Sequence, residues 1–85
     1  MNLVNQDKLN DIIGRNIKYY RIRCKKYGFF LTQERLAEMI NVSVSLISGL
    51  ESKKVKKGIS ISNLYKIAFV LDVPIKNFLE DKDEC

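Results

Sequence analysis

The chain has 85 residues, 46% of them apolar and 29% charged, which indicates one folded domain over residues 1–85 and disfavours a disordered protein. The net charge is +5, but residues 1–79 hold 14 basic and 6 acidic side chains and so carry +8, because four of the acids lie in the last six residues. This excess favours a polyanionic partner over a surface that is charged merely for solubility.

Several classes of protein are disfavoured by what the sequence lacks. No apolar run approaches the roughly 20 residues of a membrane span, and the N-terminus has no signal-peptide pattern. The sequence contains no His, and Cys24 and Cys85 do not have the spacing of a zinc site or of a disulfide framework. We therefore expect a cytoplasmic protein that is not an enzyme and needs no metal, no cofactor and no small-molecule substrate.

Apolar residues at helical spacing predict a first helix after a loose segment 1–6, with Asp7 as its N-cap. Its buried stripe is expected to contain Leu9, Ile12, Ile13, Ile17, Tyr20 and Cys24. Its basic face is expected to contain Lys18, Arg23, Lys25 and Lys26. Gly14 lies inside this pattern, where it marks either close packing against another element or the true start of the helix.

The segment Tyr27–Leu31, with the sequence YGFFL, is expected to end the first helix, with Gly28 as the C-terminal breaker. Two aromatic residues are unusual in a linker. Phe29 and Phe30 either close the edge of the core, which we favour, or form an exposed apolar patch for a partner.

The next stretch predicts two short helices joined by a tight turn. Thr32 is the expected N-cap of the first of them, with Leu31 and Leu36 at the positions of a hydrophobic staple. Asn41 follows the last helical residue, where a left-handed conformation is needed and Asn is the best residue after Gly. The chain is therefore expected to turn sharply at this residue.

A helix over residues 44–52, capped by Ser43, is expected to follow the turn. Ile47 and Leu50 point inward in this pattern, together with Val42 from the turn. The outward side then holds Val44, Ser45, Ser48 and Gly49, with Leu46 at the margin. A solvated helix normally carries Glu, Lys or Arg there, so we expect this surface to approach another molecule closely.

Four lysines follow this helix directly, in the sequence KKVKKG that Gly58 ends: Lys53, Lys54, Lys56 and Lys57. They form either a solvated connector or a cluster that binds phosphate groups. Their position next to the helix with the small outward side favours phosphate binding.

A fourth helix capped by Ser60 or Ser62 and a last short helix over Ile75–Leu79 complete the pattern, with Pro74 between them. The apolar face of the fourth helix contains Ile61, Leu64, Ile67, Ala68 and Leu71, flanked by Tyr65, Phe69 and Val70. Phe78 and Leu79 are expected to cover the core. The prediction is an all-α fold of five helices, with a core over about 9–79 and loose tails at 1–6 and 80–85.

The chain resembles the phage-repressor-like helix-turn-helix domains of the lambda-repressor, Cro and XRE type. The resemblance covers about residues 13–79 and is strongest in TQERLAEMINVSVSLISGLES and LYKIAFVLDV. It implies a compact five-helix domain whose central helix 44–52 lies in the major groove of DNA, while the preceding helix crosses the phosphate backbone.

The resemblance also implies roles for single residues. Gln33 matches a phosphate-binding position, and Lys53, Lys54, Lys56 and Lys57 would add to it. Arg21 and Glu51 match a structural ion pair. The positions nearest the bases are those of Ser43, Val44, Ser45, Ser48 and Gly49.

The sequence departs from the family pattern in three places. It has about five extra residues between Arg21 and Thr32, and Asn41 replaces the common Gly of the turn. Val44, Ser45 and Gly49 stand where Gln, Arg or Asn often read bases, so bidentate base contacts are unavailable. Specificity would then come from serine hydrogen bonds, from contact of Val44 or Leu46 with thymine methyl groups, and from DNA shape.

We therefore hypothesise a sequence-specific regulator of transcription, a repressor, that binds double-stranded DNA as a homodimer. The dimer contact would lie in the last helix, the termini or the Phe29–Phe30 loop. The alternative is a protein-interaction module of the antitoxin or antirepressor-target type, using Phe29, Phe30 and Leu46 on the same fold.

Overall fold

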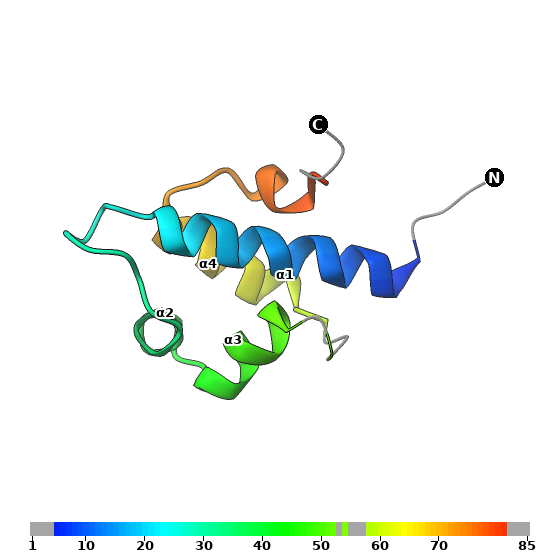
Figure 1. Cartoon of the computed structure of the whole chain (residues 1–85), viewed down its shortest axis with the longest axis horizontal. Coiled ribbons are helices and arrows are strands. Elements are labelled where there is room, and N and C mark those ends of the chain that lie inside the picture. The colour runs from blue at the N-terminus through cyan, green and yellow to red at the C-terminus, as the bar shows by residue number, and fades with distance from the viewer. Residues whose placement is uncertain (1–4, 53, 55–57, 82–85) are drawn as a thin grey trace.

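The computed structural model describes residues 5–52, 54 and 58–81, which form four α-helices, one 3-10 helix and no strand. The elements are α1 (Gln6–Arg23), α2 (Gln33–Ile40), α3 (Val44–Glu51), α4 (Ile61–Leu71) and η1 (Ile75–Leu79). In Figure 1, α1 runs across the molecule, α2 and α3 lie on one side of it, α4 lies behind and η1 covers the other side. This is the expected all-α fold, with a 3-10 helix as the fifth element. Within these residues, none of the helices is both long and apolar enough to cross a membrane.

The hydrophobic core takes one fully buried residue or more from every element. Ile17, Leu36, Ile47, Ile67 and Phe78 are each completely shielded from solvent. All five lie at positions that the apolar spacing of the sequence predicts to face inward. Burial of such a side chain stabilises the fold by about 1.5–3 kcal/mol, so this shared core fixes the helices relative to one another.

Helix α1 differs from the prediction at both ends. Asn5, not Asp7, is the N-cap, and its side chain accepts a hydrogen bond of 2.7 Å from the Lys8 N–H. Both residue types cap helices well, so composition alone does not choose between them. The helix ends at Arg23 and not near Gly28, which instead occupies a turn with φ of +92°.

The loop between α1 and α2 corrects the favoured prediction for Phe29 and Phe30. These rings are 62% and 53% exposed, so they do not close the core and instead form an apolar patch. The core edge is closed by the buried Leu31 and by Tyr27, whose hydroxyl donates a 2.8 Å hydrogen bond to the Val70 carbonyl.

Helix α4 is capped by Ser60, whose side chain accepts a hydrogen bond from the Asn63 N–H. The helix ends at Leu71 because Asp72 adopts a left-handed conformation with φ of 59°, two residues before Pro74. Pro74 lies between the two helices as expected, but the sequence pattern did not identify Asp72 as the residue that ends α4. Asp tolerates this conformation better than most residues do.

Two residues expected in the core are exposed. Ile61 is 72% exposed because it begins α4 on the stripe that also carries Tyr65 and Phe69, and that stripe faces away from the core. Leu79 is also exposed, while the neighbouring Phe78 alone fills the core under η1.

The C-terminal segment is tied to α1 as far as it is described. The buried Asn16 side chain donates two 2.8 Å hydrogen bonds, to the carbonyl oxygens of Phe78 and Glu80. Arg15 forms an ion pair of 3.5 Å with Asp81. Glu80 and Asp81 are therefore held rather than loose, and Gln6 already belongs to α1. Residues 1–4 and 82–85 of the expected tails lie outside the described residues.

Candidate nucleic-acid interface

Helices α2 and α3 are joined by a turn of three residues, 41–43, with capping interactions on both sides. Asn41 adopts the expected left-handed conformation, with φ of 61° and ψ of 49°. The Val42 N–H then donates a 2.9 Å hydrogen bond back to the Ala37 carbonyl of α2. The Ser43 side chain accepts from the Leu46 N–H at 3.1 Å and so begins α3. These caps set the angle at which α3 leaves α2.

The C-terminal end of α3 is held by a polar clamp, defined here as Arg21, Gln33 and Glu51. The Arg21 guanidinium donates from Nε and Nη2 to the two carboxylate oxygens of Glu51, each at 2.8 Å. Gln33 Nε2 adds a 2.9 Å hydrogen bond to Oε1 of Glu51. The side chains of the ion pair are only 7% and 3% exposed. The clamp therefore connects α1, α2 and α3 through one buried carboxylate.

Arg21 also fixes the start of α2. Its Nη1 donates a 2.8 Å hydrogen bond to the carbonyl oxygen of Leu31, immediately before the N-cap Thr32. No buried side-chain nitrogen or oxygen of the described residues lacks a hydrogen-bond partner. A buried charge whose three nitrogen atoms each donate a hydrogen bond is costly to disturb, so α3 is held firmly at this end.

Gly14 allows the close approach of α1 to α3. A Cβ atom at this position would overlap the carbonyl oxygen of Leu50 and lie 3.0 Å from its carbonyl carbon. Because α1 begins at Gln6, Gly14 does not mark a helix start, and close packing is the correct alternative. The sequence carried a signal for this role, because Gly14 and Arg21 are seven residues apart and so share one face of the helix.

The outward side of α3 is formed by the residues expected there. Ser43, Val44, Ser45 and Ser48 are exposed, and Gly49 is half-buried. Leu46 is half-buried and packs against the core, so it belongs more to the fold than to the outer surface. The exposed side of α3 is therefore narrow, small and almost without charge.

The serines of this surface differ in what their hydroxyl groups can offer to a ligand. The Ser43 hydroxyl accepts from the Leu46 N–H but keeps its own hydrogen for donation. The Ser48 hydroxyl donates to the Ser45 carbonyl at 3.3 Å. The Ser45 hydroxyl forms no hydrogen bond with the described residues, and Val44 adds an exposed methyl surface. One free hydroxyl, one free donor and two methyl groups thus face outward within one turn.

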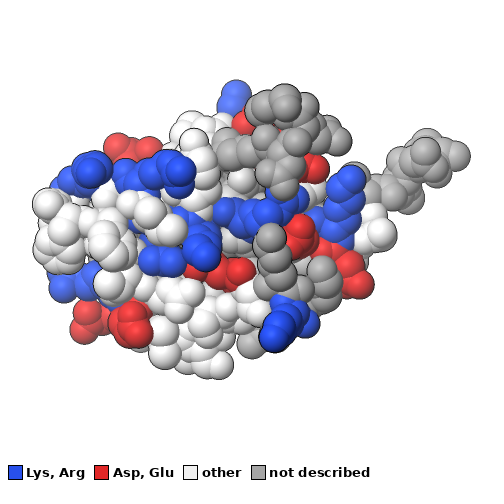
Figure 2. All heavy atoms as spheres, in the orientation of Figure 1, with Lys and Arg blue, Asp and Glu red and all other residues white. Residues whose placement is uncertain are grey.

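The basic residues expected to bind phosphate are described only in part. Lys54 is exposed directly beyond α3, whereas Lys53, Lys56 and Lys57 lie outside the described residues. Figure 2 shows Lys and Arg side chains gathered over α1, while the edge of the molecule formed by α3 is largely uncharged. Positive charge therefore lies beside the outward side of α3 and not on it.

Gln33 takes part in the clamp through one hydrogen of its amide group, which sequence reasoning did not foresee. The second amide hydrogen and the first backbone N–H groups of α2 lie at a helix N-terminus, which favours anions. Groups of three or more His, Cys, Asp or Glu that could hold a metal ion do not occur in the part of the chain that the structure describes.

Comparison with known proteins gives matches of two kinds. The sequence model of the helix-turn-helix family matches residues 31–78, which include α2, the turn, α3 and α4. The crystal structure of the hypothetical transcription factor NHTF from Neisseria is similar in fold, with a TM-score of 0.75 and 24% sequence identity. The similarity covers 99% of this chain and 88% of that chain. No match was found among curated proteins.

Proposed function

This chain belongs to the helix-turn-helix family of the lambda-repressor type, and we propose that it regulates transcription by binding duplex DNA with α3 in the major groove. The observation that carries the proposal is the outward side of α3. It combines small exposed side chains, at Ser43, Val44, Ser45 and Ser48, with a helix position fixed by the buried clamp. Small side chains let the helix backbone approach the base edges closely.

Phosphate groups supply most of the affinity in this proposal. The N-terminal amides of α2 and the free amide hydrogen of Gln33 bind one phosphate, and Lys54 binds another beyond α3. Lys53, Lys56 and Lys57 extend the second contact. Because each neutralised phosphate releases a counterion, the logarithm of the binding constant falls with the logarithm of salt concentration by about 0.9 per contact.

Base recognition then depends on few contacts. The Ser45 and Ser43 hydroxyl groups form single hydrogen bonds, and Val44 contacts a thymine methyl group. Since a bidentate pair would add about 1–3 kcal/mol of discrimination and none is available from α3, DNA shape carries much of the specificity. We expect moderate sequence preference and a strong dependence on salt.

Two copies of the chain are proposed to bind two half-sites about one helical turn apart, which matches a two-fold protein to a palindromic site. Repression is the proposed mode of action, because a dimer that fills the major groove at a promoter excludes other proteins without any further activity.

The experiment that tests the proposal is selection of bound fragments from a random duplex pool, followed by anisotropy titration of the selected duplex. We expect a selected site with two-fold symmetry and a dissociation constant that rises by at least tenfold between 50 and 200 mM salt, on the order expected for a few phosphate contacts. An unenriched pool, or binding that ignores salt, would contradict DNA binding through this surface.

A second candidate function rests on the exposed Phe29 and Phe30. Phe29 lines an open depression of about 430 Å³ together with Thr32, Glu34 and Arg35, where another protein could dock. Leu46, which the alternative also invoked, packs against the core instead. A complex held by the two rings should persist at high salt, whereas the DNA complex should not.

A further inference from the structure

We propose that the outer face of α4 is the surface through which two copies of this chain associate. The face consists of Ile61, Tyr65 and Phe69, spaced by four residues and so aligned along one side of the helix. These side chains are 72%, 64% and 72% exposed. Three large apolar residues exposed in one row on one helix indicate a contact surface.

The surroundings of this row give it the shape of a ridge between two grooves. One groove, of about 400 Å³, runs along Met39, Ile40 and Asn41 on one side of Tyr65 and Phe69. The other, of about 390 Å³, runs along Asp72, Val73, Pro74 and Ile75 on the other side. A ridge beside a groove is self-complementary under two-fold rotation, because the ridge of each copy enters the groove of the other.

The area available fits a dimer of ordinary size. Because a buried aromatic side chain contributes about 150–250 Å², the exposed parts of Tyr65, Phe69 and Ile61 together offer roughly 400 Å². A standard interface buries about 800 Å² on each partner. The ridge therefore supplies about half of that area, and the surface around the two grooves must supply the rest.

The charges around the ridge are also compatible with a second copy. Lys66 lines one groove, and Asp72 lines the other beside Lys26. When each ridge lies in the groove of the other copy, the Asp72 carboxylate of one copy is available to Lys66 of the other. A partner of another kind that is purely acidic or purely basic would complement the charge of only one of the two grooves.

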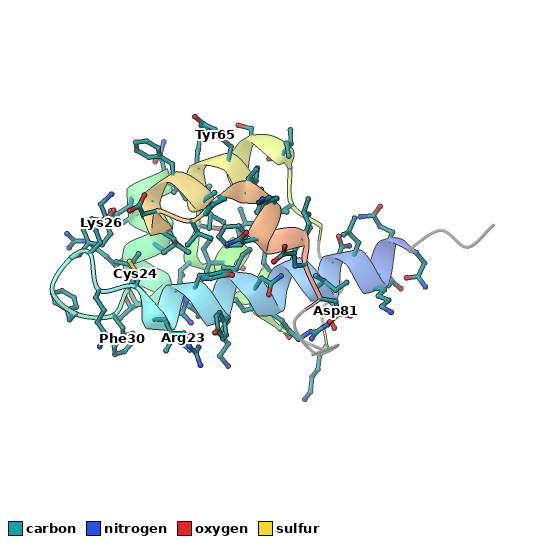
Figure 3. The ribbon with its side chains drawn as sticks, turned by 90° about the horizontal axis from the view of Figure 1, so that it is seen from above. Arg23, Cys24, Lys26, Phe30, Tyr65 and Asp81 are labelled. Atoms are coloured by element: carbon teal, nitrogen blue, oxygen red, sulfur yellow. The ribbon has the colours of Figure 1, made fainter. Side chains whose placement is uncertain are left out.

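The position of the ridge leaves the DNA-binding surface free. Helix α4 packs against α2, η1 and α1, and the outward side of α3 takes no part in either groove. In Figure 3, Tyr65 points outward from α4 at the edge of the molecule opposite to Arg23 and Phe30. The proposed contact is thus distinct from the Phe29–Phe30 patch, which the sequence had suggested for a dimer. The need for two copies rests on the proposed function, but the choice of surface does not.

The test is light scattering and sedimentation of the full chain without DNA, at 0.5 M salt and over a range of concentrations. We expect wild type to be a dimer, Phe69→Glu and Tyr65→Glu to associate at least 30-fold more weakly, and Phe30→Glu to remain a dimer. Phe30→Glu is the matched control, because it makes the same change at an exposed Phe of another surface. Unchanged circular dichroism and thermal melting would show that each variant is folded.

Three results would overturn the proposal: a wild-type monomer at all concentrations, a Phe69→Glu dimer as stable as wild type, or equal losses in Phe69→Glu and Phe30→Glu. Binding to a duplex with a single half-site tests the proposed function separately from the contact surface. Phe69→Glu should bind this duplex as tightly as wild type does, because one copy is enough. If no duplex binds at all, the proposed function fails, while the scattering result still decides the contact surface.

Discussion

Helices α3 and α4 begin with the same local pattern and present opposite kinds of surface. Each has a Ser N-cap, a β-branched first residue and a Ser at the second position, in Ser43–Val44–Ser45 and Ser60–Ile61–Ser62. Beyond this start, the exposed side of α3 continues with Ser48 and Gly49. The exposed side of α4 continues with Tyr65 and Phe69.

The two helices are also supported differently. α3 is held by buried polar interactions of Glu51 and by the close approach of Gly14 to Leu50. α4 is held mainly by apolar packing through Leu64, Ile67, Ala68 and Leu71. This difference is consistent with the two proposals, because directional interactions would place α3 accurately in a DNA groove, whereas apolar packing would suffice for α4 to meet a second copy. The local start of a helix therefore says little about its role.

The largest effect is expected from removing the charge that fixes α3. Glu51→Gln leaves the buried Arg21 guanidinium without its carboxylate, and loss of one partner of a buried pair costs about 3 kcal/mol or more. Urea denaturation should show this loss in the free energy of unfolding. The matched control is Asp11→Asn, which removes the partially exposed pair with Arg15 and should cost less than about 1 kcal/mol. Equal effects of the two substitutions would show that the clamp contributes no more than a surface pair.

The next largest effect concerns the approach of α1 to α3. Gly14→Ala places a methyl group against the Leu50 carbonyl, and the forced separation should cost about 2–3 kcal/mol despite the higher helix propensity of Ala. Gly58→Ala is the control, because its Cβ would lie 3.6 Å from the Asn10 side chain, at ordinary contact distance. Thermal melting should give a Tm for Gly14→Ala that is well below the Tm of Gly58→Ala. A Gly14→Ala variant as stable as wild type would contradict the tight packing.

A third prediction compares the two serines at the second position of α3 and α4. Ser45→Glu brings a carboxylate to the phosphate-lined groove and should weaken binding to a single half-site by about 30-fold, or about 2 kcal/mol. Ser62→Glu makes the same change at the same helix position and should leave this binding within about twofold, because α4 lies outside the proposed DNA-binding surface. Both variants should fold normally, since each serine is exposed. If anisotropy titration shows equal losses of affinity in the two variants, α3 and α4 do not differ in their contact with DNA.

The smallest effect is expected for Lys54. Lys54→Ala should weaken binding severalfold at every sequence and reduce the slope of log K against log salt by about 0.9. On a duplex with a single half-site, where the proposed dimer contact plays no part, Lys66→Ala removes the same charge from α4 and should leave the slope unchanged. A slope that does not change in the Lys54 variant would mean that this lysine contacts no phosphate.

The sequence predicted the helix-turn-helix well because its signals are local. Thr32, Asn41 and Ser43 each specify a cap within a few residues, and the apolar spacing locates Leu36, Ile40, Ile47 and Leu50 inside. The ion pair of Arg21 and Glu51 came from the family resemblance and is present in the structure, while the roles of the exposed α3 residues and of the lysines remain predictions.

Other features depend on tertiary contacts that spacing does not reveal. The role of Gly14 depends on a carbonyl 36 residues away, and the role of Gln33 depends on the position of Glu51. Phe29, Phe30 and Ile61 were expected in the core because they are apolar, but aromatic and β-branched residues at a surface look the same in a sequence as buried ones. Their exposure is visible only once the other helices have filled the interior.

The most direct measurement is a titration of the ¹⁵N-labelled protein with the selected duplex, followed by amide NMR. We expect the largest chemical-shift changes at the amides of residues 33 and 43–49. When the duplex has a single half-site, the amide resonances of Tyr65 and Phe69 should not shift. Shifts confined to α4 or to the Phe29–Phe30 patch, with the amides of Val44, Ser45 and Ser48 unmoved, would contradict the placement of α3 in the groove.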